Sequence, residues 1–246
     1  MRSKDTTNLV LATLRDEILN LDIQPGQLFK EGELCERFEA SRTPVHAALE
    51  RLSEEKLMEF VPYKGVRATL LNFSNIYQSI LLRALLETEA IVEFTKQADA
   101  FSLERCAHLM RNQQILLSSE QFEPSAFYGL DARMHKVWFD EAGLPLFWDV
   151  IQNAEVNYTR FRMLDIVKMH NFKEIVHEHV VLLSLMEQRR IEKIERVVNY
   201  HLFGGIRRMH DLLRTELAPY FEDVQSIKPY LDRVMAIQRP PCLSEE

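Results

Sequence analysis

Four polar side chains occupy helical positions where the surrounding periodicity calls for apolar residues. Asp131 and His135 are four residues apart, so they lie one above the other on a helix. His179 shares its helical face with Ile, Val, Leu and Met residues, and His201 shares its face with Ile and Val residues. One Asp and three His are therefore expected to point into a helical core from three helices.

Metal binding is the chemistry that these four residues could support together. Buried polar groups need partners, and three imidazoles with one carboxylate are a sufficient ligand set for Zn²⁺, or alternatively for Ni²⁺ or Mn²⁺. The alternative is that each is a hydrogen-bonded core residue. The remaining histidines follow no apolar stripe and are expected at the surface or in loops; they are His108, His170, His177 and His210.

Two arginines fall on apolar stripes of the same region. Arg83 lies four residues before Glu87, and Arg162 lies on a stripe with Ile151 and Tyr158. An arginine beside a metal is suited to gripping an organic carboxylate through two hydrogen bonds. Arg83 and Arg162 are therefore candidate effector-binding residues. The alternatives are an Arg83–Glu87 ion pair within one helix and a structural role for Arg162.

The elements that must position these residues are helices. Residues 73–218 show a helical pattern throughout, with breaks expected near 101–102, 123–124, 143–145 and 170–171. Six or seven helices and no strand are predicted there. The tail, residues 219–246, contains Pro229, Pro240 and Pro241 and is expected to add at most one short helix before it frays.

Residues 1–72 have a different pattern, which is helix, helix, helix and hairpin. A turn at Gln24-Pro25-Gly26 ends the first helix, and Ser41 is a favoured N-cap for the third. Residues 57–71 indicate two short strands around a turn at 63–65. This order predicts a winged helix-turn-helix domain in a mainly α protein, followed by an all-α helical bundle.

The third helix would present a polar surface outward. Its inward stripe is Val45, Ala48, Leu49 and Leu52. Thr43, His46 and Glu50 then face away from the core, with Arg42 at the tip of the helix. In a helix-turn-helix protein this is the surface that meets DNA.

Composition indicates a soluble cytoplasmic protein. The three cysteines have no metal-binding spacing, and no apolar run approaches the length of a membrane span. The net charge of −7 is shared by both regions, since residues 1–72 hold ten Lys and Arg against twelve Asp and Glu. Any DNA contact must therefore come from a local basic patch.

The segment SRTPVHAALERL, with the Pro-Gly turn before it and the Lys64-Gly65 wing after it, resembles the winged helix of the GntR transcription regulators. The second region is similar to the all-helical FCD domain of the FadR-like subfamily. In that domain an Asp-x-x-x-His pair and two later histidines about 22 residues apart bind a metal. Asp131 with His135, and the interval from His179 to His201, match that pattern.

The resemblance implies a homodimer that binds a near-palindromic, double-stranded DNA operator, acts as a repressor, and does not catalyse a reaction. Arg42 and Thr43 correspond to DNA-contacting positions of the family, and Lys64 and Gly65 to the tip of the wing. A small organic acid would bind at the metal and shift the DNA-binding domains.

Two positions depart from the family pattern. Most relatives have Arg where this chain has His46, and often Gly where it has Glu39. If His46 contacts DNA, the operator sequence should differ from those of relatives. The alternatives to an effector-controlled regulator are a metal-dependent enzyme that uses the Asp/His₃ centre and a degenerate regulator with weak DNA binding.

Overall fold

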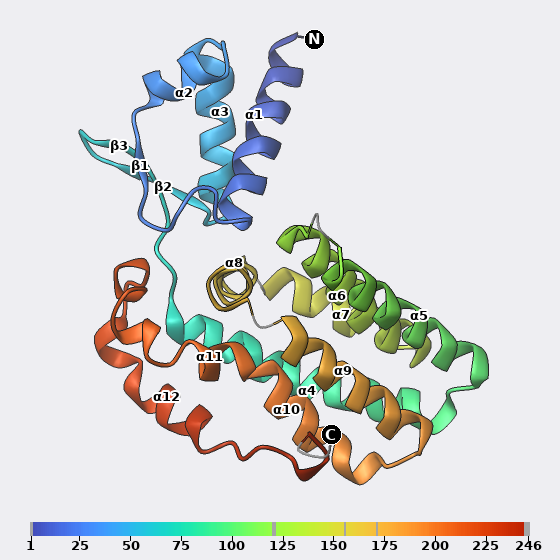
Figure 1. Cartoon of the computed structure of the whole chain (residues 1–246). Coiled ribbons are helices and arrows are strands. Elements are labelled where there is room, and N and C mark those ends of the chain that lie inside the picture. Colours follow the sequence, from blue (N-terminus) through green and yellow to red (C-terminus); the bar gives the residue numbers. More distant parts are fainter. Residues whose placement is uncertain (1, 120–121, 155, 171, 244–246) are drawn as a thin grey trace.

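The computed structural model describes residues 2–119, 122–154, 156–170 and 172–243. It is mainly α, as the sequence predicts, and it forms two lobes (Figure 1). One hydrophobic cluster lies within residues 10–68, and separate clusters lie within residues 71–243. None of the described helices is long and apolar enough to cross a membrane.

The upper lobe is a winged helix-turn-helix with one more strand than the sequence predicts. Its elements are α1 (Arg2–Leu19), β1 (Leu28–Phe29), α2 (Glu31–Arg37), α3 (Arg42–Glu54), β2 (Met58–Val61) and β3 (Gly65–Ala68). The antiparallel sheet has the order β1-β3-β2. The two-residue strand β1 is too short to show a periodic pattern, and its pairing with β3 defines it.

Burial of its apolar face fixes the position of helix α3. The four residues of the predicted inward stripe are all buried. Ser41 occupies the N-cap position, but its side chain accepts no capping hydrogen bond from the described backbone. The predicted N-cap position is therefore correct, but the Ser41 side chain does not form the expected capping hydrogen bond. Burial of the apolar stripe holds the helix in place instead.

Gly65 is required by a close backbone approach in the wing. Its φ is +123°, and a Cβ there would lie 2.1 Å from the carbonyl oxygen of Phe29 in β1. Gly65→Ala is expected to lower the free energy of unfolding of this lobe by roughly 2–3 kcal/mol, from backbone strain and from lost β1–β3 pairing. Chemical denaturation would measure it.

Gly32→Ala is the matched control, because Gly32 lies in α2 of the same lobe and a Cβ there would meet nothing within 4 Å. A Gly65→Ala protein as stable as Gly32→Ala would contradict this account of the wing.

The lower lobe is a helical bundle. Its elements are α4 (Phe73–Gln97), α5 (Ala100–Leu117), α6 (Pro124–Glu141), α7 (Pro145–Ala154), α8 (Val156–Leu164), a π-helical turn η1 (Asp165–Met169), α9 (Phe172–Glu187), α10 (Ile191–Leu202), α11 (Gly204–Arg208) and α12 (Lys228–Met235), with 3₁₀ turns at η2 (Leu212–Arg214), η3 (Ala218–Tyr220), η4 (Val224–Ser226) and η5 (Pro241–Leu243). The long helix α4 contacts α6, α7, α8, α9 and α10. It thus forms the axis of the bundle.

One helix start lies slightly earlier than the sequence indicates. The break expected at Phe101-Ser102 falls at 98–99, because the Asp99 side chain accepts a hydrogen bond from the Ser102 backbone N–H at 2.8 Å and caps α5. The breaks before Pro124 and Pro145 lie as predicted.

The C-terminal tail packs over more of its length than the sequence predicts. Beyond α12, Leu243 is 1% exposed and belongs to the main hydrophobic cluster. The predicted fraying therefore does not begin before residue 244, and residues 244–246 lie outside the described part. Buried apolar side chains hold the tail, and their partners come from helices distant in sequence.

The tail also holds the connection between the lobes. Leu71 pairs with Phe221 in a parallel bridge, and the Leu71 N–H donates to the Tyr220 carbonyl at 2.8 Å. The Asp223 carboxylate accepts hydrogen bonds from the backbone N–H groups of Phe73 and Ser74, at 2.9 and 3.1 Å, at the start of α4. The linker thus leaves the wing along a fixed path.

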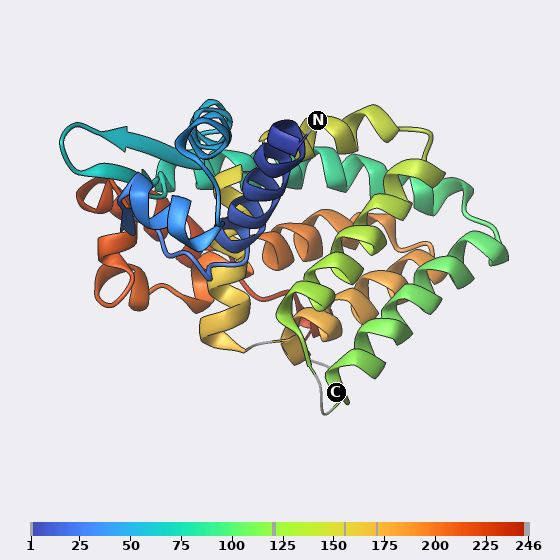
Figure 2. The ribbon, with the colours of Figure 1, turned by 90° about the horizontal axis from the view of Figure 1, so that it is seen from above.

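Helix α8 fastens the same linker from the other side. The fully buried Arg160 donates to the Thr69 hydroxyl at 3.0 Å and to the Thr69 carbonyl at 2.7 Å. Seen from above, α8 lies beneath α1, which it contacts (Figure 2). Helix α8 is therefore a part of the lower lobe that lies between its core and the upper lobe.

Candidate metal centre and nucleic-acid interface

Three histidine side chains converge in the core of the lower lobe. His135 of α6, His179 of α9 and His201 of α10 are buried, and their ligand nitrogens lie within 4.8 Å of one another. The Nε2 atoms of His179 and His201 are 3.3 Å apart. Residues 66 positions apart in the chain therefore meet at one point.

Asp131 completes the set that the sequence predicts. It lies one helical turn before His135, and its Oδ2 is 3.7 Å from His135 Nε2. Its Oδ1 is 3.5 Å from His179 Nε2. All four residues predicted to bind a metal are thus brought together.

Each imidazole is held from behind through its Nδ1 atom. His179 Nδ1 lies 3.1 Å from Gln113 Oε1, and His201 Nδ1 lies 2.7 Å from Glu178 Oε2. His135 Nδ1 contacts Glu87 Oε1. Partners of this kind fix the orientation and tautomer of metal-binding histidines in other proteins.

The hydrogen-bond partners of Nδ1 indicate which ring nitrogen of each histidine carries the proton. Gln113 Nε2 donates toward Asp131 Oδ1 at 3.5 Å, so Gln113 Oε1 accepts from the Nδ1–H of His179. The carboxylates of Glu87 and Glu178 likewise accept from the Nδ1–H groups of the other two rings. Each Nε2 then carries a lone pair, and His135 Nε2 has no hydrogen-bond partner among the described residues. Three converging lone pairs and a carboxylate are a donor set that fits a divalent cation.

Burial keeps the imidazoles neutral. It lowers the pKa of His135 and of His179 well below the ordinary range, and it lowers the pKa of His201 to about 3 although the Asp131 charge opposes that shift. Neutral imidazole is the form that binds a metal.

Arg162 faces the same site from α8. Its Nη2 donates to Asp131 Oδ2, and its guanidinium carbon lies 4.7 Å from the centre of the Tyr128 ring. Burial alone would raise the pKa of Asp131, but the surrounding groups, with Arg162 contributing most, together outweigh burial and lower that pKa to about 2. Arg162 therefore lies beside the four predicted metal ligands, and its role in binding an effector stays a prediction.

Arg83 is linked to the site through Glu87. Its Nε donates to Glu87 Oε2 at 2.8 Å, and the other oxygen of Glu87 contacts His135. The intrahelical ion pair that the sequence allows is therefore present, and it lies directly behind a predicted metal ligand.

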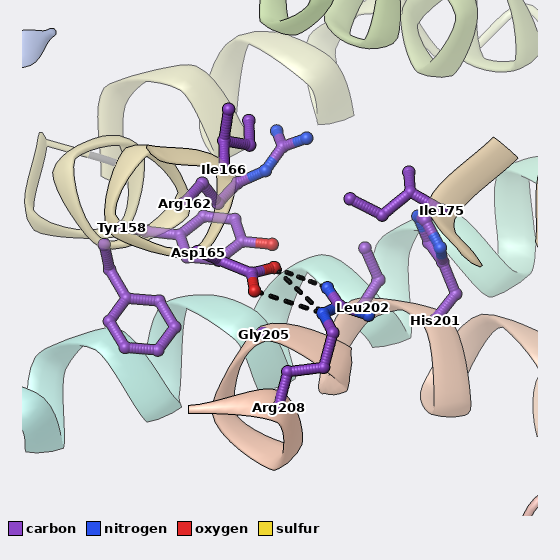
Figure 3. A pocket seen from close by; sticks show the side chains of 10 residues that line it. Tyr158, Arg162, Asp165, Ile166, Ile175, His201, Leu202, Gly205 and Arg208 are labelled. Carbon is purple, nitrogen blue, oxygen red and sulfur yellow. Dashed lines mark hydrogen bonds and ion pairs between the residues drawn. The ribbon is translucent and has the colours of Figure 1, made fainter. Parts of the chain in front are cut away.

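A small cavity adjoins the histidines (Figure 3). His201, Arg162 and Arg208 are among its lining residues, with Tyr158 and Asp165. Its volume is about 30 Å³, and roughly 10–15 Å³ of such space holds one water molecule. An organic acid would therefore have to displace side chains in order to enter.

The outer face of α3 carries the residues predicted to meet DNA. Arg42 and Thr43 are exposed at its N-terminus. His46 is also exposed, but its Nδ1 lies 3.2 Å from Glu31 and its Nε2 3.6 Å from Glu50. Its ring contacts that of Phe60 in the wing, with centroids 5.3 Å apart. His46 thus lies between two carboxylates, which sequence reasoning did not foresee.

The wing tip presents Tyr63 and Lys64. Lys64 is exposed as predicted, and Tyr63 is fully exposed at a φ of +60°. Gly65 has a structural role, since it pairs with Val61 and approaches β1. Tyr63 is an exposed aromatic residue at the tip that the sequence interpretation passed over.

Comparison with known families covers both lobes. The model of the FCD domain matches residues 78–204, which is more than half of the chain. The model of the bacterial regulatory proteins of the gntR family matches residues 6–67. The chain belongs to the GntR family of FCD type. It is a DNA-binding transcription regulator and not an enzyme.

Named relatives of this GntR regulator are distant. It is 24% identical over 192 residues to the HTH-type transcriptional repressor RspR of Escherichia coli K12, covering 77% of this chain and 82% of RspR. The solved structure of E. coli McbR/YncC has a TM-score of 0.62 at 15% identity, covering 84% of this chain and 98% of that one. A GntR family member from Pseudomonas syringae pv. tomato has a TM-score of 0.50 at 23% identity, covering 87% and 88%. These two structures support the fold alone.

Sequence reasoning missed Gln113 and Glu178 in this GntR regulator, although both touch predicted ligands. A signal existed for Glu178, which directly precedes His179 in the sequence VHEHV. Adjacent helical residues differ by about 100° in direction, so both can be buried only where two neighbouring helices cover the helix. That condition cannot be read from one segment.

The outer partners give a testable effect. Gln113→Leu keeps the side-chain size and removes the contacts to His179 and Asp131, so Zn²⁺ affinity is expected to fall by roughly 10–100-fold. Competition against a chromophoric zinc chelator would measure it. Gln114→Leu, at the exposed neighbouring position, is the control. Equal affinities in the two variants would show that Gln113 does not support the site.

Proposed function

We propose that this GntR regulator is a metabolite-controlled repressor that acts in the cytoplasm as a homodimer on a near-palindromic operator. A divalent metal at Asp131, His135, His179 and His201, most suitably Zn²⁺ and alternatively Ni²⁺ or Mn²⁺, would take part in binding a small organic acid. The observation that carries this proposal is the convergence of three buried, unprotonated imidazole nitrogens beside a carboxylate.

The choice of metal follows from the donor atoms. Three imidazole nitrogens with one carboxylate are common for zinc and are also used by other transition metals. The metal would supply a positive centre that attracts an organic carboxylate. The protein's own part is to hold the rings through Glu87, Gln113 and Glu178 and to exclude bulk water by burial.

A carboxylate effector is supported by the arginines. Arg162 lines the cavity next to His201, and it is already paired with a carboxylate, that of Asp131. Arg83 lies deeper and holds Glu87. We therefore assign direct contact with the effector to Arg162 and indirect support to Arg83.

An exposed apolar surface supports a homodimer. Leu81 and Leu85 lie one turn apart on α4, and Leu85 is 65% exposed. Leu146 and Val150 are exposed on α7, which packs against α4. An exposed apolar surface of this kind is suited to a contact between two copies of the chain. In a dimer that binds a two-fold symmetric operator, both copies would contribute the same surface.

DNA binding would use the outer face of α3 and the tip of the wing. Arg42 and Thr43 would meet the major groove, and Lys64 would reach the backbone or the minor groove. We propose that His46 contributes to the choice of operator sequence, although the carboxylates of Glu31 and Glu50 place negative charge next to it. These two carboxylates also favour a second candidate, which is a regulator with weak DNA affinity.

Control of the operator by the acid requires a mechanical link, and α8 is suited to provide it. Arg162 of α8 lies at the metal centre, and Arg160 of α8 binds Thr69 in the linker. Repression as the output is proposed by similarity to RspR.

Operator titrations test this proposal. The Zn²⁺-loaded protein would be titrated onto DNA from upstream of its own gene, with and without a panel of organic acids and with and without chelator. We expect specific binding at physiological salt that one class of acids weakens only when metal is present. Binding no tighter than to unrelated DNA would favour the weak-affinity candidate, and an acid response unaffected by chelator would contradict the metal's role.

A further inference from the structure

A buried ion pair lines the cavity beside the candidate metal centre. Arg208 of α11 donates through Nε to the two carboxylate oxygens of Asp165, at 3.1 and 3.2 Å (Figure 3). Both side chains are more than nine-tenths buried, and both line the cavity together with Arg162 and His201. The pair therefore forms part of the cavity wall. It is also the main polar contact between the two sides of the cavity.

Two consecutive glycines make room for this pair. A Cβ at Gly204 would lie 2.6 Å from Arg208 Nη1, and a Cβ at Gly205 would lie 3.3 Å from Asp165 Oδ2. Neither glycine has a positive φ, so space and not backbone conformation accounts for them. They are the first two residues of the five-residue helix α11, and a side chain at either position would crowd the ion pair.

The pair is poorly explained as a stabilising contact. A buried ion pair is often no more stable than apolar residues of the same size. Arg208 Nη1 makes no hydrogen bond to any residue that the structure describes, and the nearest further carboxylate, that of Glu174, is 3.7 Å away. Asp165 also begins the π-helical turn η1, and such turns are frequent at functional sites.

The cavity therefore has two arginines, and a carboxylate of the protein occupies each. Arg162 holds Asp131, which a bound metal would recruit as a ligand. Arg208 holds Asp165, for which no metal would compete. An acid bound at the metal and Arg162 thus has a second cationic group within the same cavity. It can reach that group only by replacing Asp165.

We infer that Arg208 is a second carboxylate subsite, that Asp165 fills it in the ligand-free protein, and that the effector is an organic diacid. This inference rests on the proposed carboxylate effector and deepens it. One carboxylate of the diacid binds at the metal and Arg162. The other forms the ion pair with Arg208 while Asp165 turns toward water, so the buried arginine keeps a carboxylate partner and the cavity of about 30 Å³ gains room.

Displacement of Asp165 would also affect the contact between α8 and the linker. Asp165 lies five residues after Arg160, at the junction of α8 and η1. When the Asp165 carboxylate leaves Arg208, the turn η1 loses its attachment to α11, and α8 is free to shift its contact with Thr69.

Binding of a matched series of acids tests the inference. The Zn²⁺-loaded full-length protein would be titrated calorimetrically with unbranched dicarboxylates from malonate to adipate and with the monocarboxylate of each chain length. We expect at least one diacid to bind 10-fold or more tightly than its monoacid. Arg208→Gln is expected to remove that preference while leaving monoacid affinity within about twofold. Asp165→Asn is expected to raise diacid affinity, because the competing charge is gone.

Controls separate the possible failures. Arg196→Gln, an exposed arginine on α10, should leave every affinity unchanged. If Arg208→Gln does not fold, the double variant Asp165→Asn with Arg208→Gln removes both charges together and should lose the same preference. Monoacids that bind as tightly as every diacid, or a diacid preference that survives in the Arg208 variants, would overturn the inference and leave the proposed function intact. Binding of neither series would overturn both.

Discussion

Replacing His179 with alanine is expected to weaken Zn²⁺ binding by more than about 100-fold and to abolish the thermal stabilisation given by organic acids. The imidazole is one of three that converge, and loss of a direct ligand should exceed the roughly 10–100-fold effect of losing an outer partner. A ligand that binds only the folded state raises its stability, so loss of the metal also removes the acid's stabilising effect. Zinc competition titrations and thermal unfolding with and without acid would measure both.

The control for this variant lies on the same helix. His177 is two residues away, lies outside the cluster, and is only partly buried. His177→Ala is therefore expected to bind zinc as the wild type does. If acids stabilise the His179→Ala protein as much as the wild type, they bind somewhere other than the metal centre.

Replacing Arg160 with methionine is expected to disconnect the acid from DNA binding. Methionine retains the apolar stem and loses both hydrogen bonds to Thr69. Coupling between two sites is typically about 5–150-fold, and in this variant the acid-induced change in operator affinity should fall to within about twofold. Zinc and acid affinities should stay unchanged, because Arg160 contacts the linker and not the centre. Operator titrations with and without the acid would measure the coupling.

Two further variants sharpen this test. Thr69→Val removes the hydroxyl that accepts from Arg160 and donates to the Lys56 carbonyl, but keeps the Thr69 carbonyl as an acceptor for Arg160, and should reduce the coupling partially. Arg133→Met, an exposed arginine on α6, controls for the loss of a positive charge. Coupling in Arg160→Met that equals the wild-type value would show that the signal does not pass through this contact.

Local pattern was sufficient for much of the fold. Helical spacing of apolar residues predicts α3 and the bundle helices, because burial of one face is a property that short segments carry. Proline predicts the starts of α6 and α7, because its fixed φ suits the first helical turn. The strand β1 and the packed tail were missed, because each depends on a partner far away in the chain.

The candidate site divides in the same way. Asp131 and the three histidines could be found because a polar residue on an apolar stripe is visible in one helix at a time. Gln113 and Glu178 could not be found, because their significance comes from which imidazole each one meets. The apolar stripe on its helix made Arg162 a candidate effector-binding residue. Its partner Asp131 is set only by the packing of α8 against α6.

The sequence by itself determined the family, the helical architecture and the four residues of the candidate metal centre, since each follows from residue type and spacing within single segments. The tertiary structure alone decided which nitrogens carry protons, that Asp165 and Arg208 close the cavity, and that α8 joins this cavity to the linker. The physical reason is that hydrogen-bond partners and buried charge pairs are contacts between helices. Such contacts are set by how the whole chain packs, and no single segment encodes them.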